Sequence, residues 1–349
     1  MKSDEKRDLL DFTGDELTEI VATLGEKPYR GAQIYSWIYA LGVLDIDSMT
    51  DLSTEFREAL KEGFSLKSPE VTETLKSVDG TIKFVTLLTD ATRIESVIIV
   101  EDERVTLCVS TQAGCALDCA FCLTGALGAG RDLGLAEMSG QLFSARSLLQ
   151  DGQKITNIVL MGMGEPLLNY NEVIKFVDIL VDQKGFAFAP RRVTLSTAGI
   201  VPMIKRLGED SSINLAVSLN ATTDEVRSRL MPINKKYPLK KLVKALKEYP
   251  LSKSRHITIE YVLIGGVNDT RVDAKRLAGL LRGISVKINL IPYNPHEGAN
   301  LKAPTSESVL NFKDILLRER YIAVIRSSKG ADILAACGQL SQKGKANTK

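Results

Sequence analysis

Residues 108–125, CVSTQAGCALDCAFCLTG, decide the fold of this chain. Cys108 ends an apolar, β-branched run, and Cys115, Cys119 and Cys122 follow it with the spacing CxxxCxxC. The chain has five cysteines, and an odd number clustered this tightly indicates metal binding or redox chemistry rather than a disulfide framework. Because three of the thiols lie in one short loop directly after a predicted strand, they can converge on a single centre.

Ligand counting distinguishes two kinds of metal centre. Structural zinc takes four ligands, generally as two separated pairs, and Cys108 could supply the fourth only from within the preceding strand. An iron–sulfur cluster held by three cysteines leaves one iron open to a small molecule, and Phe121 within the triplet would shield such a cluster. The spacing at a strand end therefore favours a cluster over zinc, and an open iron implies catalysis.

The composition is that of a globular protein. The 349 residues are 44% hydrophobic and 25% charged, with a net charge of +2, and they suffice for one large domain and a smaller one. The first twenty residues are too charged for a signal peptide, and no apolar run approaches the roughly 20 residues that span a bilayer. We therefore expect a cytoplasmic protein that does not contact a membrane.

Strand and helix patterns alternate from the cysteine stretch onward. Strands are predicted at residues 106–110, 155–161, 192–197, 213–219, 256–264, 286–292 and 321–326. Helices are predicted between them at residues 137–150, 171–184, 239–248, 271–282 and 306–320. Repeated strand–helix units predict parallel strands covered by helices, and about six units fit an incomplete (β/α)6 barrel of the α/β class better than a closed eight-stranded barrel.

The chain before this array shows two different sequence patterns. Apolar residues at spacings of three and four predict helices, with Thr13 and Ser53 as N-caps. Alternating β-branched residues then predict antiparallel strands, with a hairpin at Asp79-Gly80. We therefore predict four parts: an N-terminal helical accessory domain (1–68), an antiparallel β extension (69–105), the partial barrel (106–330) and a C-terminal segment with a basic tail (331–349).

Small or polar residues follow four of the predicted strands. The sequences are GMGEP, STAG, NATT and YNP, at residues 162–166, 196–199, 220–223 and 293–295. Any one of them could be a helix cap or a turn. Because the carboxyl ends of parallel strands meet at one edge, where α/β folds place their active sites, the four together predict one ligand lying across the sheet.

Residues 226–256 form a basic stretch within a nearly neutral chain. Ten Lys or Arg stand there against a single acid, Glu248. A local positive field of this kind is typical of surfaces that contact phosphate backbones. A solvated helix face is an equally good interpretation of the same charges.

Six motifs together resemble a known family. In order they are TLCVSTQAGCALDCAFC, MGMGEPLLN, RRVTLSTAGIVP, PINKKYPL, KINLIPYNP and AACGQL. CxxxCxxC followed by GMGEP resembles the radical S-adenosylmethionine (SAM) superfamily, and the full set resembles the RlmN/Cfr family of RNA adenine methyltransferases over almost the whole chain. The resemblance implies a 4Fe-4S cluster and SAM as cofactors, 23S rRNA and tRNA as partners, a flavodoxin or ferredoxin as electron donor, and a monomer. It also implies that the N-terminal helical domain (1–68) binds RNA.

The resemblance also implies roles for individual residues. Cys337, near the far end of the chain, would become S-methylated, Cys108 would be its partner thiol in a disulfide, and Glu95 would accept a proton. The cluster ligands would be Cys115, Cys119 and Cys122, and the SAM contacts would be Gly164, Glu165, Ser196, Ser218, Leu219, Asn220 and Asn294. Without the resemblance, Cys108 would be a core cysteine and Glu95 a charge facing solvent.

The reaction of the family explains why two thiols are needed. An adenine C–H carbon is a poor nucleophile, whereas a thiolate attacks a sulfonium methyl group readily. The resemblance accordingly implies a ping-pong reaction through S-methylated Cys337 that uses two SAM and methylates C2 of adenine 2503 in 23S rRNA and of adenine 37 in tRNAs. Two alternatives remain: the C8 methyltransferase branch of the same family, and a zinc-stabilised RNA-binding protein without catalytic activity.

Three positions depart from the usual pattern of the family. Asn220 stands where a histidine is usual, and its amide forms hydrogen bonds but does not titrate near neutral pH. Ala129 and Asp132 stand where Phe and Asn are more frequent. We expect these last two changes to loosen the local packing and to add a negative charge.

Overall fold

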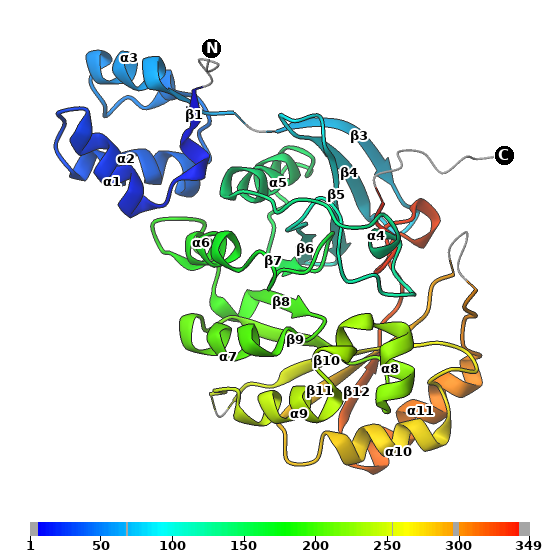
Figure 1. Ribbon diagram of the computed structural model, residues 1–349. Coiled ribbons are helices and arrows are strands. Elements are labelled where there is room, and N and C mark those ends of the chain that lie inside the picture. The colour runs from blue at the N-terminus through cyan, green and yellow to red at the C-terminus, as the bar shows by residue number, and fades with distance from the viewer. Residues whose placement is uncertain (1–5, 68, 253, 296–299, 342–349) are drawn as a thin grey trace.

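The computed structural model describes residues 6–67, 69–252, 254–295 and 300–341, and ten of its described strands form one large sheet (Figure 1), while β1 (Arg7–Asp8) and β2 (Phe64–Ser65) pair with each other in a separate small sheet. The barrel strands are β6 (Arg104–Cys108), β7 (Asn157–Leu160), β8 (Val193–Thr197), β9 (Asn214–Ser218), β10 (Ile257–Leu263), β11 (Val286–Pro292) and β12 (Ile322–Ile325). Each of these strands pairs in parallel with the next one along the chain. In the described part of the chain β12 lies at one edge of the sheet, so the barrel stays open, and the predicted incomplete barrel is confirmed.

Helices connect the parallel strands and cover the sheet. They are α5 (Leu135–Ser147), α6 (Tyr170–Val181), α7 (Val201–Asp210), α8 (Asp224–Leu230), α9 (Leu239–Glu248), α10 (Arg271–Leu280) and α11 (Ser306–Arg318). Their apolar faces are buried; in α6, for example, Val173, Phe176 and Leu180 are fully enclosed. The sequence patterns predict α5, α6 and α9–α11 to within a few residues but do not predict α7 or α8. α8 has only seven residues and buries one apolar side chain, Leu230, and the ten residues of α7 bury only Ile204 and Leu207.

The antiparallel extension continues the same sheet beyond β6. It consists of β3 (Glu70–Lys76), β4 (Ile82–Leu87) and β5 (Arg93–Glu101), and β5 pairs with β6 so that Val97 lies opposite Cys108. The hairpin predicted at Asp79-Gly80 is confirmed, because Ser77 N donates to Thr81 O at 2.8 Å and Gly80 has φ +84°. The cysteine loop therefore begins at a strand in the middle of the sheet, between the barrel and the extension.

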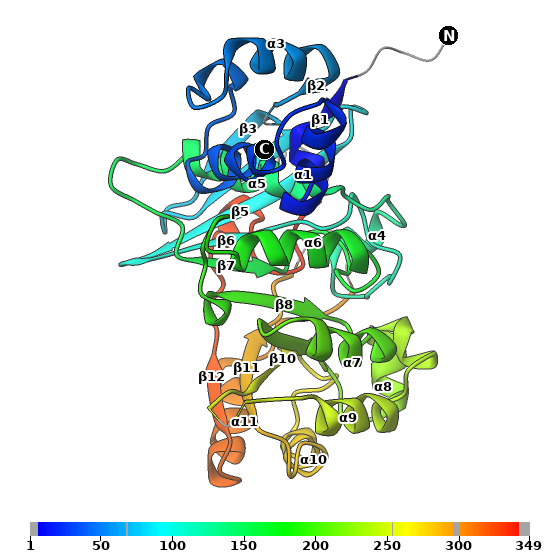
Figure 2. The ribbon, with the colours of Figure 1, turned by 90° about the vertical axis from the view of Figure 1, so that its left-hand side faces the viewer.

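The N-terminal helices are α1 (Gly14–Thr23), α2 (Tyr29–Tyr35) and α3 (Thr54–Gly63); α1 lies beside α6, and α3 lies at the far end of this part, away from α6 (Figure 2). Both predicted caps are confirmed: Thr13 Oγ1 accepts from Glu16 N at 3.3 Å, and Ser53 Oγ accepts from Phe56 N at 3.2 Å. Lys175 of α6 joins Glu16 in an ion pair at 2.9 Å, which links this part of the chain to the barrel. Among the described residues, no helix is long and apolar enough to cross a membrane.

Two helical glycines offer a matched test of this packing. A Cβ added at Gly140 in α5 would lie 2.2 Å from the Pro69 ring, whereas one added at Gly279 in α10 would meet nothing within 4 Å. We expect Gly279→Ala to raise the free energy of unfolding by about 0.5–1 kcal/mol, because alanine is the better helix former. Gly140→Ala should lower it by about 1–3 kcal/mol, because the added methyl group overpacks the contact. Urea unfolding followed by circular dichroism measures both changes, and equal shifts in the two variants would contradict the packing at Pro69.

Candidate active site

The parallel strands bring most of the predicted site residues to one edge of the sheet. They are, in strand order, the cysteine loop after β6, Gly164 and Glu165 after β7, Ser196 in β8, Ser218 at the end of β9 with Leu219 and Asn220 after it, and Asn294 after β11. This is the edge at which α/β folds bind their ligands. Asn294 is further held there by Ser328, whose Oγ donates to its Oδ1 at 2.6 Å.

The three thiols of the cysteine loop, Cys115, Cys119 and Cys122, lie close enough to influence one another electrostatically. Burial raises the pKa of Cys115 to about 11, and the charges of Cys122 and Glu165 act in the same direction. Burial also raises the pKa of Cys119, with contributions from Cys122 and Cys115. Within the described residues, no three His, Cys, Asp or Glu side chains are grouped as they would be around a single metal ion. A 4Fe-4S cluster does not need such a group, because each thiolate binds a different iron atom.

Glu165 is the buried carboxylate at the centre of this edge. Its Oε2 accepts a hydrogen bond from Ala198 N at 2.7 Å, and its Oε1 accepts one from Leu167 N at 3.1 Å. Burial raises its pKa to about 7. The preceding Gly164 has φ +101°, and a Cβ there would lie 2.5 Å from Gln112 Cβ. The carboxylate is thus fixed by two loops and retains lone pairs that can accept from an ammonium group.

Gln112 supports the backbone of Glu165. It lies within the cysteine motif, but its residue type did not mark it as a site residue. Its Oε1 accepts from Glu165 N at 2.8 Å, and its Nε2 donates to Asp132 Oδ1 at 2.7 Å. Asp132 adds the expected negative charge, and its carboxylate orients the amide that supports Glu165. Ala129, the other departure in this loop, is exposed.

Asn220 lies in a strained turn after β9. It has φ +57° and is completely buried, and its Oδ1 accepts from Val262 N at 2.8 Å. Its carbonyl oxygen accepts from Asn268 Nδ2 at 2.7 Å. The side chain thus holds the end of β9 to β10, and a direct contact between it and SAM stays a prediction.

The position of Arg227 differs from the one expected for a residue of the basic stretch. The charge pattern predicts it among the residues that would contact RNA, but the structure buries it completely. Its guanidinium donates to the carbonyl oxygens of Leu219, Ala198 and Ser218 at 3.0, 2.7 and 3.2 Å, and its charge acts on the thiol of Cys119. Arg227 therefore fixes two strand ends and places a positive charge close to the cysteine loop.

The C-terminal segment, residues 330–341, returns to the cysteine loop. Leu123 N, directly after the last cysteine of the loop, donates to Gly338 O at 2.7 Å. Thr124 Oγ1 donates to Leu340 O at 2.8 Å. These two bonds join residues more than two hundred positions apart in the sequence, and they place Cys337 next to the predicted cluster ligands.

The β3–β4 hairpin holds the beginning of the same segment. Ser77 Oγ donates to Asp332 Oδ1 at 2.6 Å, and Gly330 N donates to Asp79 Oδ2 at 3.0 Å. The antiparallel extension therefore acts as a support on which the C-terminal segment lies.

Cys337 and Cys108 lie close enough to influence each other electrostatically. Burial raises the pKa of Cys108, and the charge of Cys337 raises it further. The pKa of Cys337 is raised to about 11 by burial, with smaller contributions in the same direction from the charges of Glu260 and Cys122, while the charge of Arg326 lowers it. Cys337 is nevertheless an exposed residue. The structure thus brings Cys337 near both Cys108 and the cysteine loop.

Glu95 is buried in β5, not exposed to solvent as a strand pattern alone would suggest. Its side chain is 1% exposed, and its Oε2 accepts from Ser341 N at 2.7 Å. Its Oε1 lies 3.3 Å from Lys83 Nζ. Burial raises the pKa of Glu95, while the charge of Lys83 and the hydrogen bond from Ser341 act in the opposite direction.

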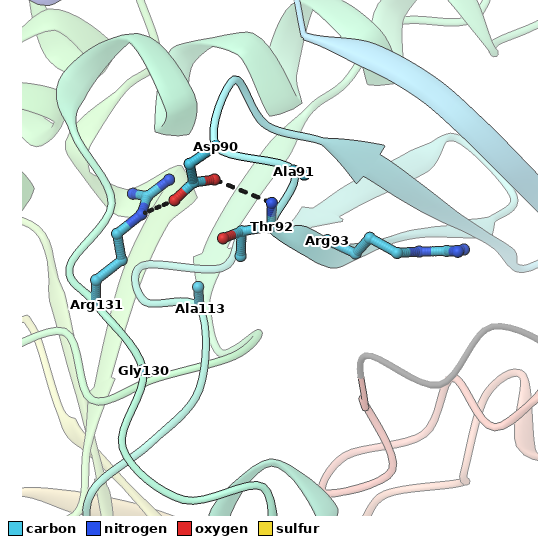
Figure 3. Close-up of a pocket in the computed structure, with 7 residues that line it drawn as sticks. All are labelled: Asp90, Ala91, Thr92, Arg93, Ala113, Gly130 and Arg131. Carbon is cyan, nitrogen blue, oxygen red and sulfur yellow. Dashed lines mark hydrogen bonds and ion pairs between the residues drawn. The ribbon is translucent and has the colours of Figure 1, made fainter.

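A cleft of about 390 Å³ lies beside the extension, between the β4–β5 turn and the residues that follow the cysteine loop (Figure 3). Arg131 Nε bonds Asp90 Oδ2 at 2.6 Å across it, and Asp90 Oδ1 accepts from Thr92 N at 3.0 Å (Figure 3). None of the predicted site residues lines this cleft. The ion pair ties the extension to the cysteine loop.

The arrangement fits the two implied cofactors. Three mutually interacting thiols next to the buried guanidinium of Arg227 suit an anionic iron–sulfur cluster. The Glu165 carboxylate, the close backbone approach at Gly164 and the polar strand ends suit an amino acid-bearing nucleoside such as SAM.

Comparisons with known proteins agree with this geometry. Residues 7–66 match the profile of the ribosomal RNA large subunit methyltransferase N-terminal domain, and residues 109–278 match that of the radical SAM superfamily. A crystal structure of a radical SAM methyltransferase from Sphaerobacter thermophilus superposes with a TM-score of 0.91 at 41% identity, covering 97% of this chain and 100% of the other.

Curated relatives match over nearly the full length. The dual-specificity RNA methyltransferase RlmN of Anaeromyxobacter dehalogenans is 46% identical, covering 98% of this chain and 93% of the relative. The proteins of the same name from Syntrophotalea carbinolica and Geobacter sulfurreducens are 49% and 48% identical, covering 98% and 96% of this chain and 92% and 93% of their own lengths. With the strand-end site, the cysteine loop and both profiles in agreement, the chain belongs to the RlmN family of SAM-dependent radical methyltransferases.

Proposed function

We propose that this protein methylates C2 of adenine in RNA, at adenine 2503 of 23S rRNA and at adenine 37 of tRNAs, in a ping-pong reaction through S-methylated Cys337. The observation that carries the proposal is the docking of the C-terminal segment on the cysteine loop, which brings Cys337 near Cys108 and Cys122. The printed name of the relatives, dual-specificity RNA methyltransferase, supports both RNA substrates.

The residues divide the work according to their positions. Cys115, Cys119 and Cys122 hold the cluster, and Glu165 with the strand ends at Ser196, Ser218 and Asn294 orients SAM. When bound, the cluster supplies the electron that cleaves SAM to a carbon-centred radical, and a flavodoxin or ferredoxin donates that electron.

The steps that involve the RNA are carried out by Cys337, Cys108 and Glu95. Cys337 takes a methyl group from one SAM, since a thiolate is a good nucleophile toward a sulfonium. The carbon-centred radical removes a hydrogen atom from the S-methyl group on Cys337, the methylene carbon bonds to C2 of adenine, and Glu95 or Cys108 accepts the proton lost from C2 as one electron leaves the adduct. The Cys108 thiolate then attacks the Cys337 sulfur, so that the Cys108–Cys337 disulfide forms as the sulfur–carbon bond to the RNA breaks, and the freed carbon takes up a proton to become the methyl group.

The position of the new methyl group tests the proposed function. Reconstituted protein, SAM and a reductant are incubated with a 23S rRNA fragment and, separately, with tRNA, and the modified nucleoside is analysed by mass spectrometry and NMR. We expect 2-methyladenosine from both RNAs and none from the Cys337→Ala variant. A methyl group at C8 would assign the chain to the Cfr branch instead.

The cysteines should separate into two groups by mutation. Replacing Cys115, Cys119 or Cys122 with alanine should abolish cluster binding, measured as iron content and visible absorption after anaerobic reconstitution. Cys108→Ala should keep the iron but accumulate RNA covalently bound to Cys337, because the partner thiol that releases it is missing. Loss of iron in Cys108→Ala would contradict this division.

The basic stretch supplies a test of RNA binding. Lys235 and Lys236 are exposed and follow α8 at the site edge of the sheet. We expect Lys235→Glu/Lys236→Glu to weaken RNA binding. The slope of log affinity against log salt should fall by about 0.7–0.9 for each phosphate group that the variant no longer neutralises.

The matched control is Lys184→Glu/Arg282→Glu. These two exposed residues follow the C-terminal ends of α6 and α10, at the opposite edge of the sheet. The control should leave affinity and slope nearly unchanged. Equal effects of the two double variants would show that only net charge matters and would refute a contact at the site edge. Lys253 and the tail at 342–349, which also belong to the predicted basic regions, lie outside the described residues.

A further inference from the structure

One buried ion pair, between Lys83 and Glu95, connects the extension to both ends of the loop that carries Cys337. Lys83 Nζ in β4 lies 3.3 Å from Glu95 Oε1, and it donates to the carbonyl oxygen of Leu334 at 3.3 Å. The other carboxylate oxygen of Glu95 accepts from Ser341 N at 2.7 Å. Leu334 and Ser341 stand three residues before and four residues after Cys337.

The burial of this pair is unusual for its residue types. The side chains of Lys83 and Glu95 are only 6% and 1% exposed. Removing a charged group from water is costly unless it is paired and hydrogen-bonded, so such pairs are weak contributors to stability as such. Lys83 and Glu95 pair with each other across the two strands, and each also bonds the C-terminal segment, Lys83 at Leu334 and Glu95 at Ser341. A role in fixing that segment accounts for the buried pair.

We propose that Lys83 is a positioning residue whose ammonium holds the Glu95 carboxylate and the Leu334 carbonyl together and thereby fixes Cys337 beside Cys108. The inference deepens the proposed function, because it rests on Cys337 as the methyl-carrying residue. Glu95 then has a second task besides accepting a proton, since the same carboxylate anchors the segment at Ser341.

The anchors outside this pair make the inference testable. Asp332 binds Ser77 through a hydrogen bond of 2.6 Å, and Gly338 and Leu340 bind the cysteine loop. If these contacts alone fix the segment, removal of the Lys83 ammonium will not change how Cys337 is presented. If Lys83 positions the segment, its removal will free the side of the loop that contains Leu334.

The experiment measures the rate at which N-ethylmaleimide alkylates Cys337 in reconstituted protein without RNA or SAM, by peptide mass spectrometry. We expect Lys83→Met to raise the rate at least tenfold and Lys83→Arg, which keeps the charge and the donors, to restore a rate within about threefold of the wild type. The control is Lys175→Met, which breaks the remote ion pair with Glu16 and should leave the rate unchanged. A wild-type rate in an iron-loaded Lys83→Met protein would overturn the proposal.

A second variant covers the case in which Lys83→Met alone does not fold. Lys83→Met/Glu95→Gln removes both buried charges and keeps an acceptor for Ser341 N, so faster alkylation in the double variant reports the missing hydrogen bond to Leu334.

In the methylation assay Lys83→Met should lower kcat with little change in KM for RNA. The alkylation rate of Cys337 is measured without turnover, so it tests the role of Lys83 independently of the reaction. If the protein methylated RNA without using Cys337, the proposed function would be refuted, and the alkylation rates would still show whether Lys83 positions Cys337.

Discussion

The hydrogen bond from Leu123 N to Gly338 O, 2.7 Å long, is the contact on which the organisation of the site depends. It joins the end of the cysteine loop to a segment that the chain reaches only after completing the barrel. The central position of β6 makes this possible, because β6 pairs with the barrel on one side and with the extension on the other. A thiol from the last part of the chain can therefore lie between the predicted cluster ligands and Cys108.

Each of the charges buried at this site is held in part by groups from another element. Glu165 is fixed by backbone donors after β7 and β8, Arg227 by carbonyls after β8 and β9, and Glu95 by Lys83 and the C-terminal segment. Unpaired, each would be expensive to enclose, so the loops they touch are fixed together with them. The site edge is thus organised by a few charged side chains that each join two loops.

The sequence predicted the features that arise from local patterns. Helix caps such as Thr13, the Asp79-Gly80 hairpin and the parallel strands follow from residue type and periodicity, and the structure confirms them. Arg227 could not be placed in this way, because a basic residue in a basic stretch has no local sign that distinguishes a buried bridge from a surface charge. Lys83 and Gln112 were missed for the same reason, since their partners are distant in the sequence. The roles of Cys108, Cys337 and Glu95 depended on the family resemblance.

The central claim of this account is that the C-terminal segment holds Cys337 beside Cys108 in the protein without RNA. It is tested most directly by oxidising the reconstituted protein with limiting diamide under anaerobic conditions and mapping the disulfides by peptide mass spectrometry. The account predicts a Cys108–Cys337 disulfide as the main product, with the iron content retained. A Cys337 that pairs between molecules or with a cysteine of the loop, while Cys108 remains a free thiol, would contradict it.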